Sequence, residues 1–302
     1  MLWGLPIAAY LFFGGLSGGL FAMSALLQLA YGSQFMRSVR TGAAVSVLSL
    51  AAGTACLLFE VGVPWKAINL IESFQNVATS WMARGAWILV VCGIIFSAFL
   101  LVALVPWPRV GGGRFARRRM ARTLNVLGIL GIIASVLLML YTGFLLNDGN
   151  GTSAWSTPLV PLLFLASSVD CGIALLVVIV RVKDRPGAHA TRLSEVMPRA
   201  LFASLTVEGT LLAMFVAQSV TTVPSAVWRS PETPVEAIML AALCVTVASL
   251  FAALVLCATR LAASRRFAPS PVAEACSLLG GLALRVFVLF FGLSCAFAAS
   301  ML

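Results

Sequence analysis

Eight long, mostly apolar stretches divide this chain of 302 residues. They lie near residues 5–31, 39–63, 82–106, 124–146, 157–181, 199–224, 236–259 and 276–301. A helix needs about 20 such residues to cross a bilayer. Hydrophobic residues make up 61% of the chain and charged residues only 10%, whereas soluble domains carry about 25% charged residues. We therefore expect an all-α integral membrane protein with eight transmembrane helices.

The basic residues are distributed unevenly between alternate loops. Most of the 20 Lys and Arg residues fall in the loops on one side, with the densest run between residues 109 and 122. Loops rich in Lys and Arg stay in the cytoplasm. We therefore expect a multi-pass protein of the inner (cytoplasmic) membrane with both termini outside, the first stretch being retained. The net charge of +10 indicates orientation, and we expect no nucleic-acid partner. Most of the tryptophans, Trp155 among them, fall at the predicted outer boundary, where indole rings form an aromatic belt.

Metal and haem ligands are sparse. The seven cysteines occur singly in apolar stretches, without a CxxC pair, and the only histidine, His189, falls in a predicted inner loop. A haem held by two histidines needs both inside the membrane, and isolated cysteines in apolar helices usually contribute to packing. We expect no haem and no metal in this chain.

Two loops differ from simple connections. Residues 64–74 carry apolar residues at helical spacing, which predicts a helix lying on the outer membrane surface or a docking surface. The glycine- and arginine-rich segment 111–119 lacks the phosphate-loop pattern, and we interpret it as a flexible inner linker that sets topology. A polar outer loop begins at Asn147. It separates four predicted spans in residues 1–146 from four in residues 147–302.

Three groups able to exchange protons are predicted at the outer leaflet on three different helices. Tyr10 and Tyr141 each lie about 7 Å below the outer surface at 1.5 Å per residue, and Glu60 is near the outer end of its span. Two readings remain open. The tyrosines can belong to an aromatic belt with Glu60 capping a helix, or the three can form a functional site.

A second group of ionisable residues lies deeper in the membrane. Asp170, Glu208 and Arg285 all reach the middle third of the bilayer. Because a buried charge there usually has a partner, we expect Arg285 to pair with one of the two acids. The remaining acid is then either protonated or part of a proton relay.

The first span carries closely spaced glycines. Gly14, Gly15, Gly18 and Gly19 form overlapping small-residue pairs. Such pairs allow another helix to approach closely, and they can also leave room for a flat ring.

Several segments, in order along nearly the whole chain, resemble the NrfD/PsrC family, the membrane subunits of polysulfide-reductase-like respiratory complexes. The matching segments are residues 3–19, 60–66, 80–87, 141–146, 158–165, Glu208 and 280–285. The resemblance implies eight or more helices in two four-helix bundles. It also implies a quinone headgroup site at the outer end of the first bundle, and no redox centre in the chain itself.

By this resemblance the chain exchanges electrons between membrane menaquinone or ubiquinone and a ferredoxin-like iron-sulfur subunit. That partner is often attached to a molybdopterin-containing catalytic subunit, as in complexes of anaerobic respiration, so this chain is not catalytic alone. We assign Glu60 as the catalytic proton carrier. The expected quinone-binding residues are Tyr10, Tyr141, Gly15 and Trp81. The expected proton relay is formed by Asp170, Glu208 and Arg285.

Two alternative functions place similar residues in the membrane. A secondary transporter also carries charges at mid-membrane between two bundles, but its interrupted helices occur at corresponding places in both halves, a pairing that this sequence does not show. A passive membrane anchor would keep the helices and lack quinone chemistry. Turnover with quinol distinguishes it from a quinone-reactive subunit.

Overall fold

The computed structural model describes residues 5–61, 81–105, 113–148, 155, 157–183, 188–222, 233–262 and 271–300. Within these residues all regular structure is helical, and eight helices are long and apolar enough to cross a membrane. The helices are α1 (Leu5–Tyr31), α2 (Met36–Val61), α4 (Trp81–Leu104), α5 (Gly113–Asp148), α6 (Leu159–Lys183), α7 (Ala188–Thr222), α8 (Pro234–Ala262) and α9 (Val272–Ser300). The predicted fold class and number of spans are confirmed.

Local signals in the sequence explain where two of the helices meet their loops. Between α1 and α2 a short 3₁₀ turn, η1 (Gly32–Phe35), begins at a glycine with φ of 60°, a conformation that glycine adopts without steric cost. At the start of α8 the Thr233 hydroxyl accepts a hydrogen bond from the Glu236 amide (3.3 Å), and the Glu236 carboxylate accepts one from the Thr233 amide (3.2 Å). This reciprocal pair satisfies amides that a helix start otherwise leaves unpaired.

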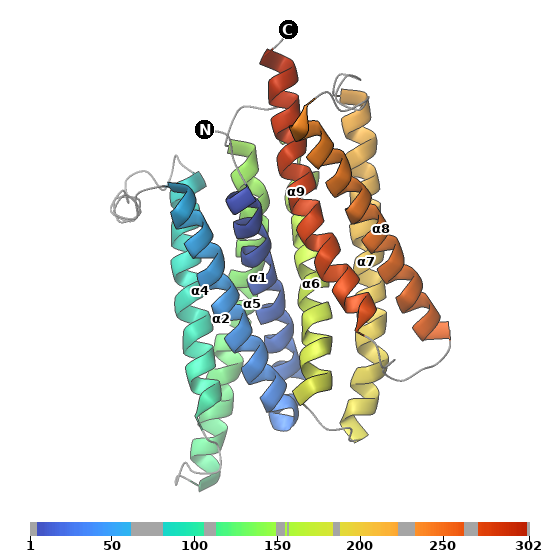
Figure 1. The fold of residues 1–302 in the computed structure, drawn as a ribbon. Coiled ribbons are helices and arrows are strands. Elements are labelled where there is room, and N and C mark those ends of the chain that lie inside the picture. Colours follow the sequence, from blue (N-terminus) through green and yellow to red (C-terminus); the bar gives the residue numbers. More distant parts are fainter. Residues whose placement is uncertain are drawn as a thin grey trace.

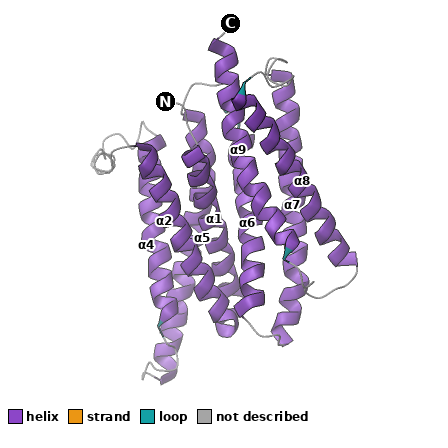
Figure 2. Cartoon of the chain, in the orientation of Figure 1, coloured by secondary structure: helices purple, strands orange, loops and turns teal. Residues whose placement is uncertain are grey.

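The helices run side by side along one common direction, and both ends of the chain lie at the same end of the molecule (Figure 1). Figure 2 shows helix throughout the described part apart from short turns. Helices α1, α2, α4 and α5 pack against one another, and so do α6, α7, α8 and α9. Because α1 also packs extensively against α6, the two sets are joined through an interface, and their division into two bundles or domains stays a prediction.

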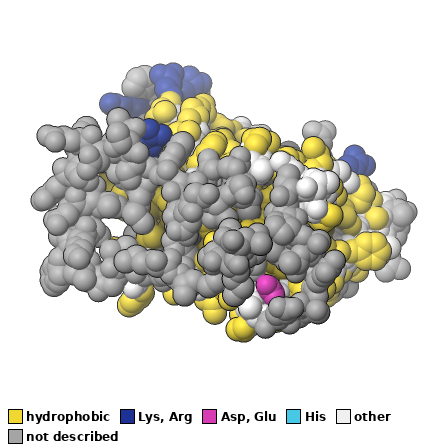
Figure 3. All heavy atoms as spheres, turned by 90° about the horizontal axis from the view of Figure 1, so that it is seen from above, with side chains coloured by type: hydrophobic (Ala, Val, Ile, Leu, Met, Phe, Trp, Pro, Cys, Tyr) yellow, Lys and Arg dark blue, Asp and Glu magenta, His cyan; other side chains and the backbone are white. Residues whose placement is uncertain are grey.

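Burial separates central helices from peripheral ones. Helices α1, α6 and α9 are mostly buried, whereas only about a third of the residues in the apolar stretches of α2, α4, α7 and α8 are buried. Many of the exposed side chains on these four helices are large and hydrophobic, including Leu48, Ile94, Val207 and Phe251. Hydrophobic side chains also predominate among the described ones at the end that carries both termini, with Lys and Arg at the margins (Figure 3). An apolar periphery of this kind suits contact with lipid.

The glycines of α1 serve the close packing that the sequence predicted. A side chain at Gly19 would collide with the backbone of Ser168 in α6, and one at Gly172 of α6 would collide with the backbone of Gly19. The α1 and α6 backbones are therefore in direct contact. Close packing of small residues stabilises helix pairs in membranes, where no hydrophobic effect drives them together.

Two predicted loop segments and one tryptophan remain to be compared with the structure. The segment 111–119 is not a linker throughout, because α5 begins at Gly113 and includes the arginine run; Arg and Ala are strong helix formers, which outweighs the glycines before them. The predicted surface helix 64–74 lies outside the described residues.

Trp155 does not belong to the aromatic belt, because it is buried and its indole N–H donates to the Val288 carbonyl of α9 at 2.9 Å. Gly292 leaves the space that its ring fills.

Candidate functional site

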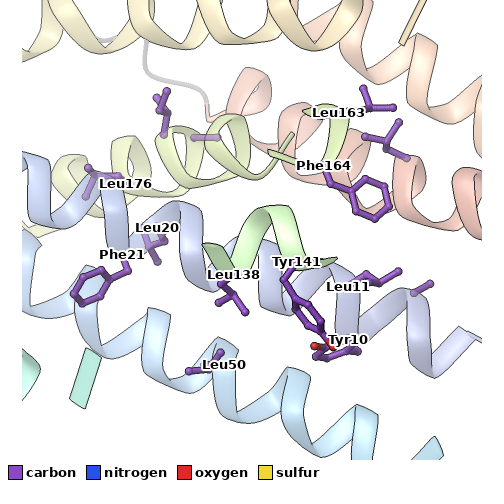
Figure 4. Close-up of a cluster of buried hydrophobic side chains, with 14 of the residues drawn as sticks. Tyr10, Leu11, Leu20, Phe21, Leu50, Leu138, Tyr141, Leu163, Phe164 and Leu176 are labelled. Carbon is purple, nitrogen blue, oxygen red and sulfur yellow. The ribbon is translucent and has the colours of Figure 1, made fainter. Parts of the chain in front are cut away.

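Tyr10 and Tyr141 meet inside the first set of helices. Tyr10 lies just over one turn from the start of α1, and Tyr141 lies two turns from the end of α5. The chain direction reverses between neighbouring spans, so both positions fall at the same end of the molecule (Figure 1). The two side chains point toward one another (Figure 4), and their hydroxyl groups interact electrostatically. The sequence placed Tyr10 and Tyr141 at a similar depth in the membrane, and in the structure they are adjacent.

The tyrosine pair is closed off from the surroundings. Tyr10 has no exposed surface and Tyr141 is 3% exposed. Among the described residues the Tyr10 hydroxyl has no hydrogen-bond partner of normal geometry. A buried hydroxyl without a partner costs about 1–3 kcal/mol, so a hydroxyl in this position would gain from a well-placed hydrogen-bond acceptor.

Helix α4 contributes Gly85 to the same place, a residue that the sequence did not predict. The space where a side chain at Gly85 would lie is occupied by the Tyr141 hydroxyl. Two turns deeper, the buried Cys92 thiol donates to the Ala134 carbonyl of α5 at 3.4 Å. Gly85 stands in one of the segments that carried the family resemblance, but nothing in the sequence alone marks it as a neighbour of Tyr141.

The other predicted residues of this site have different placements. Glu60 and Trp81 belong to the last turn of α2 and the first residue of α4, but their side chains lie outside the described part of the structure. Gly15 does not face the tyrosine pair. Its missing side chain leaves the space taken by the Arg285 guanidinium and the Ser168 hydroxyl.

Arg285 does not form the expected ion pair. In the described residues its guanidinium lies within hydrogen-bond distance of carbonyl and hydroxyl oxygens and of no carboxylate. It donates to the Leu11 carbonyl (3.1 Å), the Gly281 carbonyl (2.6 Å), the Ser167 hydroxyl (3.1 Å) and the Ser168 hydroxyl (2.8 Å). The rings of Phe12 and Phe164 lie 5.7 and 5.4 Å from its central carbon. These contacts solvate a fully buried charge, and the sequence could not reveal carbonyl acceptors.

The two deep acids come together between α6 and α7. Asp170 is 1% exposed and Glu208 is 5% exposed. The Asp170 carboxyl interacts electrostatically with Glu208, with the Ser204 hydroxyl one turn before Glu208, and with Arg285. Neither Asp170 oxygen makes a hydrogen bond of normal geometry within the described residues. Two neighbouring carboxyl groups cannot both be ionised cheaply in such surroundings, so the pair is suited to holding a proton.

A third charged cluster lies at the end of the molecule opposite the termini and was not predicted. Glu274, in the first turn of α9, accepts from Arg181 of α6 at 2.7 Å and from Arg260 of α8 at 2.8 Å. Glu274 is 1% exposed, and the Arg181 and Arg260 side chains are 17% and 9% exposed. The cluster fixes three helices to one another. Among the described residues no group of three or more His, Cys, Asp or Glu side chains is arranged to hold a metal ion.

Comparison with known proteins gives a consistent result. The family described as Polysulphide reductase, NrfD, matches residues 1–296. Protein NrfD of Escherichia coli is 30% identical over 203 residues, 63% of either protein. The C component of polysulfide reductase from Wolinella succinogenes is 30% identical over 183 residues, 58% of this protein and 56% of the relative. The C component of selenate reductase from Mesobacillus selenatarsenatis is 28% identical over 198 residues, 58% of this protein and 46% of the relative. The chain thus spans between about half and two thirds of the length of these relatives.

Proposed function

Because this chain belongs to the polysulphide reductase NrfD family, we propose that it is the membrane subunit of a multi-subunit reductase complex and exchanges electrons with a membrane quinone. Two relatives are named as lettered components of a polysulfide reductase and of a selenate reductase, which supports membership of a complex. The proposed partner is a ferredoxin-like iron-sulfur subunit at the end where both termini lie, with a molybdopterin catalytic subunit attached. The proposed location is the inner membrane with that end outside.

The observation that carries the quinone proposal is the fully buried Tyr10 hydroxyl. It has no hydrogen-bond partner of normal geometry in the described structure and faces a second phenol, Tyr141. Quinone carbonyls are hydrogen-bond acceptors, and a phenol is a neutral donor that remains protonated near pH 7. The two phenols together match the needs of a quinone headgroup.

Each residue has a distinct task in this proposal. Tyr10 and Tyr141 bind and orient the headgroup oxygens, and the low exposure of both side chains excludes water from that side. A quinone supplies two-electron chemistry coupled to two protons, which requires a titratable group nearby. We assign this task to Glu60, which lies in the last turn of α2, and we keep Trp81 as a further quinone-binding residue.

A second proposal concerns protons. Asp170 and Glu208 are buried between α6 and α7, and Arg285 lies on the neighbouring α9. We propose that the acid pair accepts and releases one proton during turnover, with the Arg285 charge lowering the cost of a charged intermediate state. In this proposal the acid pair passes protons between the middle of the membrane and the end that carries the basic loops.

The test of the quinone proposal compares Tyr10→Phe and Glu60→Gln with the unmodified chain in the purified complex. Quinol-linked turnover should fall by at least about tenfold for each variant, since each removes a donor or proton carrier, while the yield of assembled complex stays the same. A control is Tyr31→Phe, which changes a tyrosine at the other end of α1. Unchanged quinol turnover in both site variants would favour a passive membrane anchor.

A further inference from the structure

We propose that Gly85 of α4 is a positioning and specificity-determining residue for the tyrosine site, because its missing side chain leaves the space that holds the Tyr141 hydroxyl. This inference rests on the proposed quinone function and adds a further residue of α4 to it. A side chain at position 85 would collide with the hydroxyl and the adjoining ring carbons of Tyr141. Glycine is therefore the only residue that admits the phenol in its present place.

Gly85 differs from the other residues on the buried face of α4, because it has no side chain to pack there. The buried face of α4 repeats with alternating steps of four and three residues, the spacing of a packed helix seam. Its members are Gly85, Leu89, Cys92, Phe96, Phe99 and Ala103. Every other member fills the seam with its own side chain. At Gly85 the filling comes from the opposite helix, as the hydroxyl end of Tyr141.

Packing deeper in the seam fixes this alignment. Cys92 lies seven residues after Gly85 in α4, and Ala134 lies seven residues before Tyr141 in α5. The two helices are antiparallel neighbours, so the contact of the Cys92 thiol with the Ala134 carbonyl at 3.4 Å and the contact of Gly85 with Tyr141 belong to the same register. Stacking of Phe96 on Phe21 of α1, with ring centroids 3.8 Å apart, holds α4 against a further helix. The seam cannot slide to accommodate a larger residue at position 85.

Tyr141 cannot easily give way in the other direction either. Gly143, two residues later in α5, packs directly against the backbone of Pro161 in α6. Helix α6 therefore prevents α5 from moving away from α4. A methyl group at position 85 would therefore rotate the Tyr141 ring away from its place opposite Tyr10. The distance between the two phenol oxygens sets the ligand that they can bind together, which makes Gly85 a determinant of headgroup fit.

The experiment measures binding and turnover of two probes, a short-chain naphthoquinone and a short-chain benzoquinone, in the purified complex. The variants are Gly85→Ala, Tyr141→Phe and the double variant. Gly93→Ala is the matched control, because it adds the same methyl group to the same helix, where the nearest side-chain atom, Cδ2 of Leu50, is 3.9 Å away. Assembly and thermal stability are recorded for each variant.

The expected result is that Gly85→Ala weakens binding of at least one probe and raises its KM by about five- to tenfold, the size of one lost hydrogen bond. The control should leave both values unchanged. Tyr141→Phe removes the hydroxyl that would bind the headgroup, so displacing the remaining ring costs no further binding, and the double variant should bind like Tyr141→Phe alone. This lack of additivity separates a positioning role from a general effect on stability.

Other outcomes overturn one or both proposals. The role of Gly85 alone would be overturned if Tyr141→Phe weakened binding but Gly85→Ala bound as well as the control. It would also be overturned if the double variant bound more weakly than Tyr141→Phe by the full factor seen for Gly85→Ala. Quinone binding that is unaffected by Tyr141→Phe would overturn the quinone site itself. If Gly85→Ala fails to assemble, a variant that combines Gly85→Ala with Tyr141→Ala removes the whole colliding ring. Recovery of assembly in that variant supports the proposal, and continued failure overturns it.

Discussion

The Nε of Arg285 in α9 donates a hydrogen bond to the carbonyl oxygen of Leu11 in α1, at 3.1 Å. This bond joins the last helix of the chain to the first, one residue after Tyr10. The remaining guanidinium bonds go to α6 and to the carbonyl of Gly281 in α9 itself. The charge is thus solvated by uncharged oxygens of three helices, which connects the two sets of helices at the depth of the membrane.

Replacing Arg285 with Lys tests this connection. Lysine keeps the positive charge but has three donors on a flexible stem and cannot reproduce the planar fork. We expect the unfolding free energy of the chain in mixed micelles to fall by about 2–4 kcal/mol as several charged hydrogen bonds are lost. Arg199→Lys, at an exposed position of α7, is the control and should change stability by less than about 0.5 kcal/mol. Equal stability of the two variants would contradict a bonding role for the guanidinium.

Replacing Glu274 with Gln tests the charged cluster of α6, α8 and α9. The change leaves Arg181 and Arg260 close together without their shared counter-charge, and removing one partner of a buried ion pair costs about 3–5 kcal/mol. We expect a loss of about 3 kcal/mol, because both arginines retain some exposure.

The matched control for Glu274 is Glu236→Gln, which neutralises an acid in the first turn of the neighbouring α8. Glutamine can keep the reciprocal bond with Thr233, so this variant should lose less than about 1 kcal/mol. Thermal unfolding of the two variants in the same detergent gives the comparison. A loss no larger for Glu274→Gln than for Glu236→Gln would show that the cluster does not hold the helices together.

Replacing Asp170 with Asn tests the proposed proton function. Asparagine has the same shape but cannot release a proton, so proton movement coupled to quinol turnover should fall by at least about tenfold. The measurement is made on the complex in sealed liposomes with a pH-sensitive dye inside. Ser294→Ala, in a buried position of α9 whose hydroxyl bonds within its own helix to Phe290, serves as control. Proton movement that is the same in Asp170→Asn and the control would remove the acid pair from the pathway.

Much of the fold could be predicted because the membrane imposes simple rules. Every backbone amide must be satisfied within its own segment, so each apolar stretch had to be a helix, and the limits of α1, Leu5–Tyr31, matched those predicted. The start of α5 was missed, because helix propensity in the arginine run continues the helix beyond the apolar stretch. Trp155 was misplaced, since an aromatic residue near a span end can face lipid or protein.

The candidate site could be predicted only in part. Tyr10 and Tyr141 could be predicted as one group because two residues at equal depth on helices that pack together lie close to one another. Gly85 could not be found, because a glycine has no chemistry of its own and matters only through the phenol that fills its space. The pairing of Arg285 was wrong for a related reason: charge patterns reveal acids and bases, whereas its partners are backbone carbonyls and serine hydroxyls.

The amino-acid sequence by itself determined eight membrane-spanning helices and the depth of each polar group, because hydrophobicity and rise per residue act along a single segment. Only the tertiary structure decided which groups touch: the two phenols, the guanidinium and the Leu11 carbonyl, and Glu274 with its two arginines. Rotation of each helix about its axis depends on packing against several neighbours at once, and no single segment carries that information.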